Sequence, residues 1–114
     1  MKVEKLLPAH RVVCICRRGQ VRSVALRNIL IETFGFCNVL SCGWENNSAD
    51  TVAMLCEWAD VILVIGSTSI WPHVPSSRFL HKSYHFNIGA DIWGDYRSAD
   101  LHRIIMPMVE GLIE

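Results

Sequence analysis

The sequence predicts an α/β fold, a three-layer α/β/α sandwich with a small parallel sheet of about four strands. Short apolar runs rich in β-branched residues alternate along the chain with longer segments whose apolar residues recur at helical spacing. The run at residues 61–65 is apolar throughout, as expected of a parallel strand buried on both faces. Such alternation favours βαβ units, whose right-handed crossovers place helices on both faces of one sheet. We therefore expect residues 1–114 to form a single domain.

The first half of the chain predicts a strand, a helix and a second strand. A β-branched apolar run predicts a strand at residues 12–16, which gives way to a polar loop. From residue 22 apolar residues recur at helical spacing, and Gly35 follows as a stop signal, which predicts a helix of about three turns. The next apolar run predicts a strand at residues 38–41.

The second half of the chain repeats this alternation. Capping residues at 46–48 predict a helix that ends near residue 58, and the strand at 61–65 follows. Two prolines at residues 71–75 allow either a short helix or an irregular loop. A fourth strand is expected at residues 83–88, and a last helix from about Asp100, which we expect to cap it.

Composition limits the classes of partner and compartment. Eleven basic and eleven acidic side chains give a formal charge of zero, so the balance indicates neither a nucleic-acid partner nor a membrane surface. No targeting segment and no apolar run long enough to span a membrane is apparent, and we expect a cytoplasmic protein with free thiols. Four of the five cysteines, all except Cys16, are expected to be small buried hydrophobes.

The loop after the first predicted strand carries the clearest functional pattern. Cys16, five further residues, Arg22 and Ser23 form the spacing C-x5-R-S between a strand and a helix. A loop of this length can wrap around a tetrahedral oxyanion with its backbone N–H groups pointing inward, and the helix N-terminus adds its positive dipole. Gly19 suits the sharp turn that this requires. The residues expected to bind the phosphate are Arg17, Arg18, Gly19, Gln20, Val21 and Arg22.

Three residues of this loop have expected chemical roles. Cys16 is the expected nucleophile, because a helix N-terminus, inward amides and a nearby arginine all favour the charged thiolate. Arg22 offers a planar fork of donors to two oxygens of the anion. The Ser23 hydroxyl could donate to the Cys16 sulfur and stabilise it as a leaving group. Arg17 and Arg18 could also draw phosphorylated substrates to the mouth of the loop.

The stretch VVCICRRGQVRSVAL resembles the phosphate-binding loop of protein tyrosine phosphatases. Its place near the N-terminus, ahead of the candidate acid, is similar to the low-molecular-weight family of these enzymes. Residues 57–64 and 89–94 are similar to a short bacterial and phage-like branch of predicted tyrosine phosphatases. The chain departs from the low-molecular-weight family at Arg18 and Gly19, where glycine and asparagine are usual, and at Val21, which replaces a second loop cysteine.

The resemblance implies hydrolysis of phosphotyrosine or related aryl phosphate monoesters through a cysteinyl-phosphate intermediate, without metal or cofactor. The substrate would be a phosphorylated protein or a small aryl phosphate. A carboxylic acid would protonate the leaving oxygen. Asp91, ahead of Trp93, matches the resemblance best as this acid, and Asp95, followed by Tyr96, is the second candidate. Asp60, between a helix and a strand, is expected to be structural.

Other interpretations stay open from the sequence. A non-catalytic phosphate- or phosphoprotein-binding module would keep the loop without an effective acid. An arsenate reductase shares the loop but needs two further cysteines, for which Cys37 and Cys42 are available. Arg22 and Ser23 disfavour a phosphocysteine carrier. Four aromatic residues could wall a slot for an aryl group or fold back on the core, namely Trp44, Trp71, Trp93 and Tyr96.

Overall fold

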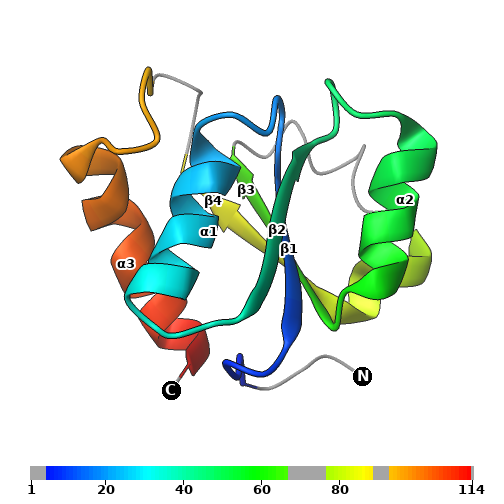
Figure 1. The fold of residues 1–114 in the computed structure, drawn as a ribbon, viewed down its shortest axis with the longest axis horizontal. Coiled ribbons are helices and arrows are strands. Elements are labelled where there is room, and N and C mark those ends of the chain that lie inside the picture. The colour runs from blue at the N-terminus through cyan, green and yellow to red at the C-terminus, as the bar shows by residue number, and fades with distance from the viewer. Residues whose placement is uncertain (1–4, 67–76, 89–92, 114) are drawn as a thin grey trace.

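A computed structural model describes residues 5–66, 77–88 and 93–113, and it confirms the predicted α/β fold (Figure 1). The strands of this part are β1 (Arg11–Cys16), β2 (Asn38–Gly43), β3 (Val61–Gly66) and β4 (Ser83–Asn87). They form one parallel sheet in the spatial order β2-β1-β3-β4. The helices are α1 (Arg22–Glu32), α2 (Ala49–Trp58), α3 (Ala99–Ile113) and the 3-10 helix η2 (Ser77–Lys82).

The sheet separates two apolar layers. Helices α1 and α3 cover one face, and α2 lies on the other (Figure 1). Successive side chains of β1 alternate between the layers, because strand residues point to opposite faces in turn. Cys14 and Cys16 pack with α1 and α3, whereas Val13 and Ile15 pack with α2. All residues of β3 are buried, as the apolar run at 61–65 predicted.

The order of the strands places a topological switch at the centre of the sheet. From β1 the chain passes to the edge strand β2 through α1, which lies on one face. From β3 it passes to the opposite edge, and Phe79 of η2 packs in the layer of α2 on the other face. Ligands of open α/β sheets bind at the carboxyl ends of strands where such connections diverge. The loop that follows β1 begins at this point.

The N-cap residues of α2 and α3 can be compared with those expected from the sequence. Ser48 is the N-cap of α2, and its hydroxyl accepts a hydrogen bond of 3.1 Å from the Thr51 N–H, as expected. The expectation that Asp100 caps the last helix is wrong. The helix begins at Ala99, and the Ser98 hydroxyl accepts from the Leu101 N–H at 3.3 Å. Asp100 therefore lies inside the first turn of α3.

The 3-10 helix η2 was not predicted from the sequence, because it lacks the apolar pattern that indicated the strands and the α-helices. Its residues Ser77–Lys82 offer no apolar run and no period of 3.6, because a 3-10 helix repeats every three residues. Residues 71–75, for which a short helix or a loop was left open, lie outside the described residues.

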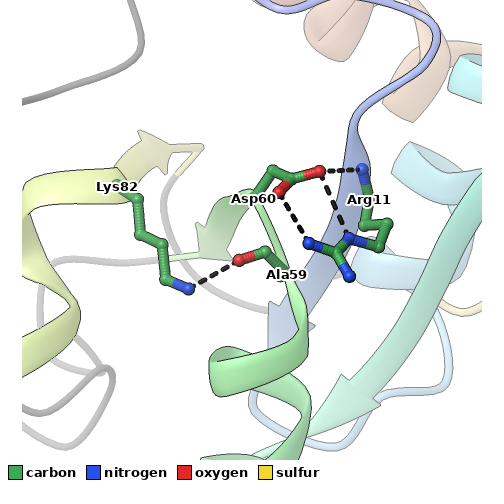
Figure 2. Close-up of polar contacts among 4 residues, drawn as sticks. All are labelled: Arg11, Ala59, Asp60 and Lys82. Atoms are coloured by element: carbon green, nitrogen blue, oxygen red, sulfur yellow. Dashed lines mark hydrogen bonds and ion pairs between the residues drawn. The ribbon is translucent and has the colours of Figure 1, made fainter.

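Asp60 joins the beginnings of the two central strands, which confirms its structural role. Its carboxylate accepts hydrogen bonds from the Arg11 backbone N–H at 2.8 Å and from the Arg11 guanidinium at 3.0 Å (Figure 2). The Asp60 N–H donates in return to the Arg11 carbonyl at 2.8 Å. On the other side, Lys82 donates to the carbonyl of Ala59. These contacts hold β1 and β3 together where the two strands begin, at the end of the sheet opposite the candidate loop.

Replacing Asp60 with asparagine is expected to lower stability at neutral pH. The hydrogen bonds from Arg11 hold the pKa of Asp60 below its usual range. A depressed carboxyl pKa contributes stability above the unfolded-state value of about 3.9, and this contribution is lost as the pH falls through the folded-state value. Urea midpoints should therefore differ between wild type and Asp60→Asn at pH 7, begin to converge as the pH falls below about 4, and meet only below the folded-state pKa of Asp60. The loss of stability in Asp60→Asn will be modest, because the side chains of the Arg11–Asp60 ion pair are about half exposed.

The matched control is Asp100→Asn. Asp100 forms an ion pair with Arg103 across one turn of α3, and both side chains are largely exposed. Exposed pairs of this kind contribute little, so the urea midpoint of this variant should stay at the wild-type value. Equal losses for the two variants would contradict a specific role for Asp60 at the start of β1.

Candidate active site

Cys16 ends β1, and Arg22 begins α1, so residues 17–21 form the predicted loop between strand and helix. The Gly19 N–H donates a hydrogen bond to Cys16 Sγ over 3.1 Å. The Cys16 thiol donates in turn to Ser23 Oγ over 3.2 Å, so the two side chains that the sequence led us to expect in contact do meet, with the thiol as the donor. The sulfur is therefore held between a loop amide and a hydroxyl group at the N-terminus of α1.

The backbone of the loop is fixed by the segment that follows β2. Three successive carbonyl oxygens accept hydrogen bonds of 2.8–3.1 Å from this segment: Cys16 from Trp44 N–H, Arg17 from Glu45 N–H, and Arg18 from Asn46 Nδ2. In a planar trans peptide the carbonyl of one residue and the N–H of the next point in opposite directions. The amides of residues 17–19 therefore point away from the segment 44–46. The bond from Gly19 to the Cys16 sulfur agrees with this orientation.

Two glycines allow the loop to lie directly against the end of β2. Gly19 has a φ of 72°, in the left-handed region that favours glycine. A Cβ added to Gly19 would lie 2.5 Å from the Gly43 nitrogen, and one added to Gly43 would overlap the Arg18 carbonyl group and the Gly19 nitrogen. Gly43 was not among the site residues expected from the sequence. It follows the predicted strand at residues 38–41, and the carboxyl ends of neighbouring parallel strands lie side by side, so its position could have indicated a contact with the loop after β1.

Arg22 is buried at the first residue of α1, with 2% of its surface exposed. Arginine is seldom buried to this degree unless its charge is paired, and Arg22 directly follows the loop in the chain. The preceding residue, Val21, occupies the N-cap position and provides no side-chain cap to the helix. The positive end of α1 therefore faces the loop, as an anion site requires.

The other loop residues lie where the sequence placed them. Gln20 is exposed and Val21 is half-buried. Arg17 and Arg18 extend from the loop into solvent on the side of β2, where both approach Glu45. The expected positive charge at the mouth of the loop is thus partly offset by a carboxylate that sequence reasoning had not considered.

The other four cysteines are free, and three of them are buried. Burial raises the pKa of Cys42 to about 12 and that of Cys56 to about 11, and it also raises the pKa of Cys14. These buried thiols are neutral at physiological pH. Cys37 is exposed, so the expectation that it is a small buried hydrophobe is wrong.

The positions of the thiols disfavour an arsenate reductase. Cys37 precedes the start of β2, which pairs with Arg11, whereas Cys16 pairs with the end of β2. The start and the end of β2 lie about 16 Å apart along the strand, so Cys37 and Cys16 lie at opposite ends of the sheet. Cys42 packs in the layer of α2, on the opposite face from Cys16. A disulfide relay through these cysteines has no direct path to the Cys16 sulfur.

The two candidate acids differ in what the structure shows of them. Asp91 lies outside the described residues. Asp95 is exposed and accepts hydrogen bonds from the Arg97 backbone N–H at 2.8 Å and from its guanidinium at 3.2 Å. The Arg97 side chain holds the pKa of Asp95 below its usual range. A carboxylate in this setting is ionised at neutral pH and is a poor proton donor.

Of the four aromatic residues considered for a substrate slot, three are described. Trp44 is half-buried and packs in the layer of α2. Trp93 is half-buried in the layer of α1 and α3. Tyr96 is exposed, with the Arg97 guanidinium 5.7 Å from its ring centre. Two of the three thus fold back on the core, and of the described three only Tyr96 is exposed, over 38% of its surface. Trp71 lies outside the described residues.

Within the described part of the chain, no three His, Cys, Asp or Glu side chains are grouped as metal ligands. No helix of that part combines the length and apolar character needed to cross a membrane. Comparison with protein-family models, curated proteins and solved structures gave no match to this chain.

Proposed function

We propose that the protein is a cysteine-dependent phosphatase that hydrolyses phosphotyrosine or related aryl phosphate monoesters. One observation carries the proposal: the Cys16 sulfur accepts the Gly19 N–H and lies 3.2 Å from Ser23 Oγ at the N-terminus of α1. This arrangement combines a nucleophile, an anion cradle and a hydroxyl group that can serve the sulfur as a leaving group. The five free thiols support a reducing compartment, and we place the protein in the cytoplasm.

The reaction would proceed in two steps. The Cys16 thiolate attacks phosphorus, the S–P bond forms, and the bond to the aryl oxygen breaks as a carboxylic acid protonates that oxygen. Water then attacks the phosphocysteine and gives its proton to the same carboxylate, and the S–P bond breaks. Arg22 and the inward amides bind the nonbridging oxygens in both steps. Ser23 donates to the departing thiolate in the second step.

Hydrolysis of para-nitrophenyl phosphate in the presence of EDTA tests the proposal. Turnover that survives chelation and requires both Cys16 and Arg22 supports it. A folded wild-type chain that binds vanadate or phosphate without turnover would overturn it. That result would favour a phosphate-binding module, the second candidate, which gains support from the ion pair that keeps Asp95 ionised.

We propose Asp91 as the general acid. Asp91→Asn is then expected to lower kcat by about 10²-fold or more, and Asp95→Asn to lower it far less, because Asp95 is held ionised by Arg97. The effect should be larger for phenyl phosphate than for para-nitrophenyl phosphate, since the poorer leaving group depends more on protonation. The pH dependence of kcat with both substrates is the measurement. A larger loss in Asp95→Asn would reverse the assignment.

A further inference from the structure

Three charged side chains meet at the mouth of the loop, and we call Arg17, Arg18 and Glu45 the rim cluster. Arg17 Nε donates to Glu45 Oε2 over 2.6 Å. Arg18 Nε lies 3.8 Å from Glu45 Oε1, an ion pair beyond hydrogen-bond distance. The exposed fractions of the side chains are 52% for Arg17, 59% for Arg18 and 36% for Glu45.

The charges of the rim cluster do not balance. The hydrogen bond from Arg17 holds the pKa of Glu45 below its usual range, so Glu45 is ionised at neutral pH. Two cations then face one anion. Arg17 is engaged directly, whereas Arg18 extends its planar fork of donors into solvent. The rim cluster therefore has one positive charge in excess, and Arg18 carries it.

The phosphate itself does not need this charge. The Gly19 amide points to the sulfur that would attack phosphorus, and Arg22 is buried at the start of α1, whereas the rim cluster is exposed. Arg18 extends outward, toward the segment after β2, and its own carbonyl is fixed by Asn46. A second anionic group on the substrate, reaching the rim beside the end of β2, would complete the hydrogen bonding of Arg18. An arginine fork fits a carboxylate in a bidentate manner.

We propose that the rim cluster selects phosphorylated protein segments that carry an acidic side chain next to the phosphorylated residue, with Arg18 binding that carboxylate. This inference rests on the proposed phosphatase function. Glu45 engages Arg17 and so leaves Arg18 as the cation available to the substrate. Because the site is exposed, the expected preference is about two- to fivefold, and it should decline with salt.

Two phosphotyrosyl peptides that differ only in a flanking Glu or Gln test the proposal. The measured quantity is the ratio of their kcat/KM values within each variant, which cancels any change in overall activity. Wild type should show a ratio of about two to five at low salt, and Arg18→Gln a ratio near one. Glu45→Gln should raise the ratio, because Arg17 is released. Arg103→Gln removes an exposed arginine of α3 and should keep the wild-type ratio.

Binding of the same peptides to Cys16→Ser separates this inference from the proposed function. Absence of turnover in wild type would reject the phosphatase, while the ratio of the two dissociation constants would still report on the rim cluster. A ratio of one in wild type at low salt, or a preference that persists in Arg18→Gln, would overturn the inference. So would a preference confined to small aryl phosphates that carry a carboxylate, because the occupant would then not be a protein segment.

Discussion

Cys16→Ser is expected to lose turnover of para-nitrophenyl phosphate by about four orders of magnitude or more, while phosphate binding persists. A serine hydroxyl is not ionised at neutral pH and cannot replace the thiolate as nucleophile. The groups that would bind phosphate are the loop amides and Arg22, and the substitution leaves them in place. Because Cys16 is buried and serine is close to it in size, the fold should be retained.

Two measurements on this variant separate loss of chemistry from loss of the site. The first is kcat in EDTA, and the second is the affinity for inorganic phosphate by calorimetry. Cys37→Ser is the matched control, since Cys37 is an exposed free thiol at the opposite edge of the sheet, and it should keep full activity. Retained turnover in Cys16→Ser would exclude Cys16 as the nucleophile. Loss of phosphate affinity together with turnover would show that the sulfur also maintains the shape of the loop.

The elements that the sequence predicted correctly are those with a local signal. Residues 61–65 form an unbroken apolar run, and β3 (Val61–Gly66) follows it closely. Ser48 capped a helix in the position where its hydroxyl could accept a backbone N–H. At the last helix the sequence indicated Asp100 as the cap, and Ser98, two residues earlier, was not considered. The structure selects Ser98, whose hydroxyl reaches the Leu101 N–H.

The candidate site was predicted only in part, because the loop is supported by a segment that lies far from it in the sequence. The C-x5-R-S spacing indicated Cys16, Arg22 and Ser23, and the structure brings Cys16 and Ser23 into contact at the start of α1, where Arg22 is the first residue. The segment 44–46, which fixes the loop carbonyls, lies nearly thirty residues further along. Its contact with the loop depends on the register of β1 against β2, and that register is a tertiary property.

Gly43→Ala is the substitution that tests this long-range support. The added Cβ would overlap the backbone of Arg18 and Gly19, neither of which can rotate away as a flexible side chain would. The loop must then shift from the end of β2. We expect kcat/KM for aryl phosphates to fall by about tenfold or more, because small displacements of a catalytic group are costly. Stability should fall by about 1–3 kcal/mol, as for other overpacked sites.

Gly111→Ala provides the matched control for Gly43→Ala. Gly111 lies in α3, where an added Cβ meets nothing within 4 Å. Alanine is favoured over glycine inside a helix by about 0.5–1 kcal/mol, so this variant should be as stable as wild type or more stable, with unchanged kcat/KM. Urea unfolding and steady-state kinetics on both variants give the comparison. Wild-type kinetics in Gly43→Ala would mean that the loop amides are oriented without the close approach to β2. Phosphate affinity would then depend on residues 16–23 alone.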